Sequence, residues 1–262
     1  MMRLLCAALL LVGGCRKNER PPLPDRQPAL ARASAFLAEF PPEQLRYDAA
    51  VGLTFVRALS DDESLRRAHQ RARERADRDA DNPMRRVWDK AARHPAKSTS
   101  EWAAPAPGSR VNVNRALVEA LYCPENGLRR STLDYIAGPM RDQGGYHTAH
   151  GLWALVLARD QGCLAGSAFT ETAGPLIAEL RKAQPERPGP STLDVDLFGE
   201  RILMMLLAGE RDAQLDQWMA ALLARQQADG GFGAAEEGRD PYQRYHATLV
   251  AVWSLAERAR VR

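Results

Sequence analysis

The sequence predicts an all-α protein built from pairs of helices. Apolar residues recur at helical spacing along most of the chain, whereas β-branched residues never alternate with polar ones over a useful length. An internal repeat divides the chain into units of about 50 residues, each with a more polar helix followed by a more apolar one. We therefore expect five helical pairs arranged as a ring or an arc, with the apolar helices inside.

Three tyrosines mark the repeat. Tyr47, Tyr146 and Tyr245 each lie at the start of an apolar helical segment, and successive tyrosines are 99 residues apart. A second alignment, offset by 100 residues, instead pairs Trp153 with Trp253. The sequence leaves this one-residue slip open. We expect the three tyrosines to occupy equivalent places at the starts of inner helices.

The helices of the five pairs follow from hydrophobic periodicity. The more polar first helices are expected at 28–40, 62–80, 131–141, 169–183 and 213–228. The apolar second helices are expected to begin near the three tyrosines and to include 111–121 and 196–207. Seven side chains on the apolar helices are predicted to be buried, namely Leu53, Leu117, Leu152, Trp153, Leu203, Leu206 and Trp253.

Turn signals and one insertion separate these helices. Gly144-Gly145 and Gly230-Gly231 predict sharp reversals of the chain. Segment 91–109 is rich in Pro, Ala and Ser and interrupts the second unit, so we expect a surface excursion there.

The first 14 residues have the features of a signal peptide. Arg3 precedes nine apolar residues, 4–12, and two glycines follow them. The apolar run is too short for a membrane-spanning helix, which needs about 20 residues. An ordinary secretory signal with a chance cysteine is the alternative to the more specific interpretation that follows.

Residues 11–15, Leu-Val-Gly-Gly-Cys, resemble the lipobox of bacterial lipoproteins. The resemblance implies cleavage after residue 14, lipid on Cys15 and attachment to a membrane. Segment 15–28 contains four prolines and predicts an extended tether, which leaves 29–262 as the helical domain. Arg16 after the cysteine resembles an outer-membrane sorting signal, so we expect a lipid anchor in the outer membrane, facing the periplasm.

The charge balance argues against nucleic acid as a partner. Removing the signal peptide removes Arg3 and lowers the formal net charge from +3 to +2, with acidic and basic residues interspersed. The basic segment 66–75 is expected to be a solvated helix face, although it could touch anionic lipid or polysaccharide. The expected partners are the membrane, through the lipid, and a glycan or an envelope protein.

Two cysteines remain for the folded domain. Cys6 leaves with the signal peptide and Cys15 carries lipid, so Cys123 and Cys163 are left. An even pair in an oxidising compartment predicts one disulfide, and both residues follow the ends of neighbouring apolar helices. Neither belongs to a Cys-x-x-Cys pair, which disfavours a metal site at the cysteines.

The strongest local motif is Gln-Gln-Ala-Asp-Gly-Gly-Phe-Gly at 226–233, followed by Tyr245-His246. Segment 142–146, Asp-Gln-Gly-Gly-Tyr, repeats part of it. The motif resembles the repeat of the prenyltransferase and squalene-cyclase superfamily, in which polar side chains bond helix ends and glycines allow the reversal. The resemblance implies an α/α toroid, with inner helices around a central cavity. Five pairs are one fewer than the usual six, so either the ring is open or 91–109 fills the gap.

The chain departs from that superfamily where its chemistry lies. Protein prenyltransferases bind zinc through an Asp-x-Cys pair and a histidine; His246 matches the histidine, but the sequence contains no Asp-x-Cys. Squalene-hopene cyclases use Asp-x-Asp-Asp, and segment 194–197 has leucine in the fourth place. The resemblance therefore predicts architecture rather than activity, and no cofactor is expected.

Residues at the starts of inner helices should converge on the cavity. The catalytic candidates are Asp194, Asp196, His147 and His246. The candidates for binding in the cavity are Tyr47, Tyr146, His150 and Tyr245. Each of them could instead cap its helix. Two histidines three residues apart, at 147 and 150, could share a metal with residue 246 or 196, but no further ligand motif supports this, so no metal is predicted.

Two functions fit this pattern. The first is a non-catalytic binding or scaffold role in the cell envelope, through the cavity or the rim of the toroid. The alternative is a divergent α/α toroid enzyme that acts on a polysaccharide or an isoprenoid-like substrate, with Asp196 and His147 or His246 as acid and base. Side chains within hydrogen-bonding reach of one another would favour the enzyme, and side chains in separate loops would favour the binding protein.

Overall fold

The computed structural model describes residues 26–92 and 111–260, and the chain is all-helical within them. The one β-type pairing among these residues is an isolated bridge between Gln226 and Phe232. The prediction of an all-α protein is therefore confirmed. The signal peptide, Cys15, most of the tether and most of the 91–109 insertion lie outside the described residues.

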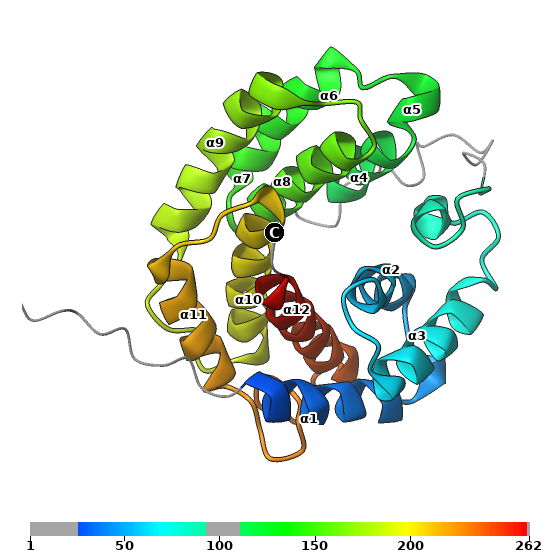
Figure 1. The fold of residues 1–262 in the computed structure, drawn as a ribbon, viewed down its shortest axis with the longest axis vertical. Helices are drawn as coiled ribbons and strands as arrows, with labels where there is room; N and C mark the ends of the chain where they lie inside the picture. Colours follow the sequence, from blue (N-terminus) through cyan, green and yellow to red (C-terminus); the bar gives the residue numbers. More distant parts are fainter. Residues whose placement is uncertain (1–25, 93–110, 261–262) are drawn as a thin grey trace, which may run out of the picture.

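Figure 1 shows how the helices are arranged. The helices are α1 (Arg26–Glu39), η1 (Pro42–Gln44), α2 (Tyr47–Arg57), α3 (Glu63–Ala76), η2 (Pro83–Val87), α4 (Val113–Leu121), α5 (Cys123–Asn126), α6 (Arg130–Tyr135), η3 (Ile136–Met140), α7 (Arg141–Gln143), α8 (Gly145–Asp160), α9 (Gly166–Ala183), α10 (Thr192–Ala208), α11 (Ala213–Leu223) and α12 (Pro241–Ala259). None of these helices is long and apolar enough to cross a membrane.

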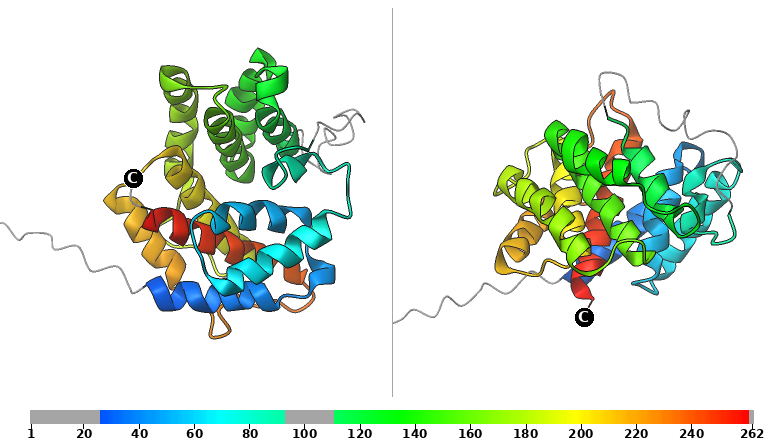
Figure 2. Two further views of the ribbon diagram at one scale, coloured as in Figure 1. Left: turned by 45° about the vertical axis from the view of Figure 1, so that its right-hand side comes forward. Right: turned by 90° about the horizontal axis from the view of Figure 1, so that it is seen from above.

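The five apolar helices pack against one another in succession. Helix α8 contacts α4 and α10, and α12 contacts α10 and α2. The short helix η2 contacts both α2 and α4. Helices α1, α3, α6, α9 and α11 lie at the periphery of this set in Figure 1. The first and last helices, α1 and α12, lie side by side, as Figure 2 also shows.

The predicted burial of the apolar helices is confirmed with one exception. Six of the seven side chains are buried, namely Leu53, Leu117, Leu152, Leu203, Leu206 and Trp253. Trp153 is only partly buried and lines a cavity, so its assignment to the core was wrong. The periodicity places Trp153 on the inward face of its helix correctly, but it cannot tell a filled interior from a hollow one.

The more polar helices differ from prediction in three places. Pro139 has no backbone N–H, and the segment expected as one helix at 131–141 contains a π-helical turn there. Helix α11 ends at Leu223 because the following residues enter the motif loop. Arg66 and Arg67 are exposed as expected, whereas Arg71, Arg73 and Arg75 are half-buried. Arg71 donates hydrogen bonds to the carbonyl oxygens of Ala38, in the last turn of α1, and of Phe40, just beyond that helix.

The predicted disulfide between Cys123 and Cys163 is confirmed. Cys123 begins α5 directly after α4, and Cys163 lies just beyond α8. The two Cα atoms are 6.2 Å apart and the bond joins residues 40 apart in sequence. It therefore ties together the ends of two neighbouring apolar helices.

Replacing both cysteines with alanine should lower the free energy of unfolding by about 3–4 kcal/mol, because the unfolded chain loses a constraint on a long loop. Urea denaturation followed by circular dichroism measures this loss. The wild type under reducing conditions should show a similar loss, and a loss below about 1 kcal/mol in both experiments would contradict the expectation.

Small residues let the apolar helices approach closely. A Cβ atom at Gly52 of α2 would lie 2.8 Å from Cδ2 of Leu249, a buried residue of α12. A Cβ atom at Gly199 of α10 would lie 3.1 Å from Cγ1 of Val250 in the same helix α12. Larger side chains at these two glycines would therefore force α12 away from its neighbours.

The substitution Gly52→Ala should destabilise the protein by about 1–3 kcal/mol, since the methyl group overpacks a buried contact. Gly174→Ala is the matched control, because Gly174 is exposed on α9 and nothing lies within 4 Å of its added Cβ. The control should be neutral or gain up to about 1 kcal/mol from helix propensity. Thermal denaturation compares the two variants; equal midpoints would rule out the close approach.

Candidate functional site

A small cavity lies among the apolar helices and is lined by α2, η2, α4, α8, α10 and α12. Its volume is about 80 Å³. The lining residues that carry polar or aromatic groups are Tyr47, Asp48, Asn114, Tyr146, His150, Trp153, Glu200, His246 and Trp253. The remaining lining residues are apolar or glycine. The cavity therefore combines an apolar wall with a few polar groups, as ligand sites do.

Equivalent positions of the repeat occupy equivalent places around this cavity. Tyr146 and His246 both line it, as do Trp153 and Trp253, and each pair is 100 residues apart. Helices α8 and α12 thus follow the alignment offset by 100 residues. Tyr47 and Tyr146, 99 residues apart, both lie in the first turn of their helices and line the cavity, whereas Tyr245 lies in the second turn of α12 and does not line it, so the predicted equivalence was wrong for Tyr245.

Helix α10 fits the same repeat with a spacing of 50 residues. Asp196 lies midway between Tyr146 and His246, and Glu200 lies 50 residues after His150. Residues four apart on a helix share one face, so the side chains of Asp196 and Glu200 project in the same direction. The repeat therefore explains why acids of α10 meet a histidine of α12.

The charged side chains in and beside the cavity differ in their exposure to solvent. The exposed fraction of the side chain is 37% for Asp48, 21% for His246, 15% for Asp196 and 4% for Glu200. Atom Nδ1 of His246 lies 2.8 Å from Oδ1 of Asp196, and Nε2 lies 4.0 Å from Oδ2 of Asp48. Tyr242 donates a hydrogen bond from its hydroxyl to Asp48. His246 is thus flanked by two carboxylates.

These surroundings set the charge of His246. Burial alone would lower the pKa of its imidazole, but Asp196, Asp48 and Glu200 outweigh burial and raise that pKa to about 10. The imidazole therefore carries a proton at neutral pH. It is a cation enclosed by acids.

Glu200 and His150 are the two deepest titratable groups of the cavity. Burial, followed by repulsion from Asp196, raises the pKa of the Glu200 carboxyl well above its ordinary value. Atom Oε2 of Glu200 is buried and has no hydrogen-bond partner. Burial lowers the pKa of His150 to about 3, and its Nδ1 lies 3.0 Å from the carbonyl oxygen of Tyr146. His150 is therefore neutral and lies 3.9 Å from Glu200.

Aromatic rings form part of the cavity lining. Trp153 meets Trp253 edge-on with ring centroids 5.9 Å apart, and Phe55, outside the lining, stacks on Trp253 at 4.8 Å. Tyr146, which is exposed, lies against His150 with ring centroids 3.8 Å apart. The lining therefore includes uncharged aromatic faces.

The structure brings some of the predicted site residues together and separates others. Of the four catalytic candidates, it joins Asp196 and His246. Asp194 is instead exposed and forms a capping box with Ser191 at the start of α10. His147 does not line the cavity, because it follows Tyr146 by one residue and is rotated by about 100° around the helix.

The cavity-binding candidates divide in the same way. Tyr47, Tyr146 and His150 line the cavity, whereas Tyr245 does not. Tyr245 is fully buried against Phe40, with ring centroids 4.6 Å apart, because it too is one position away from the inward-facing residue His246. Sequence reasoning missed Glu200. A signal was available, because Glu200 and the neighbouring arginine are the only charged residues in the apolar segment 197–208.

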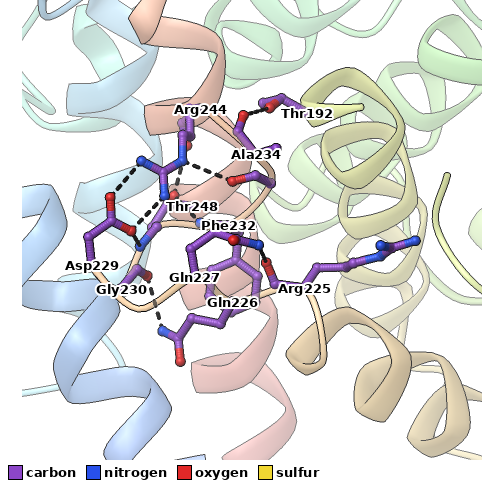
Figure 3. Close-up of polar contacts among 12 residues, drawn as sticks. Thr192, Arg225, Gln226, Gln227, Asp229, Gly230, Phe232, Ala234, Arg244 and Thr248 are labelled. Atoms are coloured by element: carbon purple, nitrogen blue, oxygen red, sulfur yellow. Dashed lines mark hydrogen bonds and ion pairs between the residues drawn. The ribbon is translucent and has the colours of Figure 1, made fainter. Parts of the chain in front are cut away.

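The Gln-x-x-Asp-Gly-Gly-Phe motif lies outside the cavity and stabilises the loop before α12 (Figure 3). Both carboxylate oxygens of Asp229 pair with the guanidinium of Arg244, at 2.6 and 2.7 Å. The amide of Gln226 donates to the carbonyl oxygens of Ala29 and Gly230, at 2.8 and 3.0 Å. These bonds fix the loop to α1 and to the first turns of α12.

The aromatic residue of the motif completes this arrangement. Phe232 is fully buried, and its backbone N–H donates to the hydroxyl oxygen of Thr248 at 2.9 Å. That hydroxyl in turn donates to the carbonyl oxygen of Arg244, so the loop is bonded on both sides of His246. The motif is therefore a structural device that fixes the position of His246.

Comparison of the chain with protein-family models, with curated proteins and with solved structures found no match.

The charge of His246 gives a pH-dependent prediction. A histidine whose pKa is raised on folding stabilises the protein fully below its ordinary pKa of 6.5, and this stabilisation is lost as the pH rises through about 10. The stability of metal-free wild type should therefore fall relative to that of His246→Gln between pH 6.5 and 10. Denaturant unfolding at a series of pH values measures the difference.

Imidazole NMR provides the control for this prediction. His246 should remain protonated at pH 8, whereas His150 should remain neutral at pH 5, since their pKa values lie near 10 and 3. A titration of His246 near pH 6.5, or a stability difference that does not change with pH, would contradict the carboxylate contacts.

Proposed function

We propose that this chain is a lipid-anchored protein of the cell envelope and that its helical domain is an α/α toroid. The domain binds a small cationic ligand in its central cavity and does not catalyse a reaction. The observation that carries the proposal is an excess of carboxylates over cations in a small cavity with aromatic walls. The anchor and the outer-membrane location rest on the lipobox-like sequence at Cys15. A disulfide is typical of proteins in oxidising compartments, which supports a location outside the cytoplasm.

Contacts among the helices support the toroid. The apolar helices α4, α8, α10, α12 and α2 contact one another in that order, and η2 contacts the two that end the series. An open ring and a gap filled by 91–109 were the two expectations. The short helix η2, which precedes that insertion, contacts both α2 and α4 and so supports a closed series of helices. The loop between α11 and α12 contains the motif at 226–233, and the resemblance of that motif to the repeat of α/α toroid proteins supports the same architecture.

The charges favour a cationic ligand. Asp48, Asp196 and Glu200 surround a single imidazolium, that of His246, and His150 is neutral. Even with Glu200 protonated, the carboxylates of Asp48 and Asp196 exceed the one positive charge. Tyrosine and tryptophan faces attract cations as well. An anion would meet two or three carboxylates and one imidazolium, so anionic ligands are disfavoured.

The size of the cavity restricts the ligand further. A volume of about 80 Å³ exceeds the share of one water, about 30 Å³, but is far below the roughly 300–1,000 Å³ of sites for drug-sized molecules. It suits an ion with a few waters or a small ammonium group rather than a chain of sugars. Binding of a glycan or an envelope protein at the rim of the helical domain stays a prediction.

A toroid enzyme acting on a polysaccharide or an isoprenoid-like substrate is the second candidate. The contact between Asp196 and His246 favours it, because a carboxylate and an imidazole are common acid–base partners. However, acid–base catalysis works best when the pKa lies near the operating pH. The pKa of His246, about 10, keeps its proton bound, and His147 lies outside the cavity. The binding role therefore fits the geometry better.

Thermal denaturation of the full chain tests the proposal. Tetramethylammonium, Zn²⁺ and Mn²⁺ are the cationic probes, and tert-butanol is an uncharged control. At least one cation should raise the melting temperature of the wild type, since a ligand that binds only the folded state stabilises it. The double variant Asp48→Asn, Glu200→Gln should lose most of that shift.

Asp194→Asn is the matched control, because it removes one carboxylate from the same helix outside the cavity, and the amide oxygen of asparagine can still accept the hydrogen bond from the backbone N–H of Ser191. It should respond like the wild type. The proposed function is wrong if no cation stabilises the protein, or if tert-butanol stabilises it as much as the cations do.

A further inference from the structure

Three possible metal ligands converge beside the cavity, and two of them, Glu200 and His246, line it. One ligand atom each from Asp196, Glu200 and His246 lies within 4.8 Å of the others. The two acids occupy positions four apart on α10, and the histidine comes from α12, which packs directly against α10. Two ligands of one metal ion with bonds of about 2.0–2.2 Å can be up to about 4.4 Å apart. Small side-chain movements therefore suffice to bring the three groups onto one ion.

A second observation points to a ligand at this cluster. The side chain of Glu200 is 4% exposed, and its Oε2 atom is buried without a hydrogen-bond partner while the residue lines the cavity. A buried carboxylate oxygen without a partner is costly, and such groups in folded proteins are usually paired or bind a metal. The nearest basic atom, Nδ1 of His150, is 3.9 Å away and already lies 3.0 Å from the carbonyl oxygen of Tyr146.

We infer that the cation bound in the cavity is a divalent transition-metal ion, held by Asp196, Glu200 and His246. The inference rests on the proposed function and specifies its ligand. One imidazole and two carboxylates suit Zn²⁺ or Mn²⁺, whereas Mg²⁺ and Ca²⁺ prefer oxygen ligands alone. The cavity leaves room for water or a small ligand at the remaining coordination positions.

The surroundings of His246 match those of a metal-bound histidine. Such histidines usually donate the second ring N–H to a carboxylate, which orients the ring. A metal ion on Nδ1 of His246, beside Asp196, would displace the proton from that nitrogen to solvent. The remaining Nε2–H faces Oδ2 of Asp48 at 4.0 Å, so a small movement of Asp48 would complete the hydrogen bond. Asp48 is itself held by the hydroxyl of Tyr242. The motif loop fixes α12 and therefore the position of the imidazole.

Isothermal titration of the metal-free full chain with Zn²⁺ and with Mn²⁺ tests the inference. The wild type should bind one ion of at least one of these metals per chain. Glu200→Gln, which keeps the shape of the buried side chain, and Asp196→Asn should each weaken binding about tenfold or more. Asp194→Asn should bind like the wild type. Circular dichroism checks that each variant is folded.

Imidazole NMR identifies the site independently of the variants. Zn²⁺ should shift the ring resonances of His246 and leave those of His69, which lies on α3, unchanged. The inference is overturned if the wild type binds neither metal stoichiometrically, if Asp194→Asn loses as much affinity as Glu200→Gln, or if the resonances of His246 do not move. Binding of tetramethylammonium without metal binding would overturn the inference but leave the proposed function standing. Binding of no cation would overturn both.

Discussion

The contact between α10 and α12 is the constraint on which the rest of the site depends. Gly199 lets these two helices approach until its missing side chain would meet Val250. At that separation, Asp196 of one helix reaches His246 of the other, at 2.8 Å. A charged imidazole within a protein needs such partners, because its loss of hydration is otherwise uncompensated. The charged form of His246 therefore depends on the close packing of α10 against α12, which brings Asp196 within reach of the imidazole.

The motif that carries the family resemblance serves this constraint rather than chemistry. Its aspartate, glutamine and phenylalanine bond or pack against α1 and the first turns of α12, and none of them lines the cavity. A loop that fixes the position of a helix is compatible with many different sets of cavity-lining residues. This explains why the resemblance predicts an arrangement of helices and says little about a reaction.

The sequence predicts the helical pairs from hydrophobic periodicity and the disulfide from the two remaining cysteines. It names Asp196 and His246 as candidates but does not predict that they are in contact. It misplaces His147 and Tyr245, since an error of one residue rotates a side chain by about 100° around a helix. Only packing decides between the two alignments of the repeat. Glu200 and Trp153 were missed for another reason, because periodicity treats every inward-facing residue as core and does not reveal a cavity.

Glu200 is the residue that the fold itself does not explain. It lies in an apolar run, its Oε2 atom has no hydrogen-bond partner, and burial and repulsion from Asp196 raise the pKa of its carboxyl. Apolar residues of similar volume in place of buried charges are often neutral or stabilising. Natural proteins break such local rules mainly at functional sites. A cation beside Glu200 would offset both the desolvation of its carboxylate and the repulsion from Asp196. The buried carboxyl that destabilises the empty protein therefore favours binding of a cation.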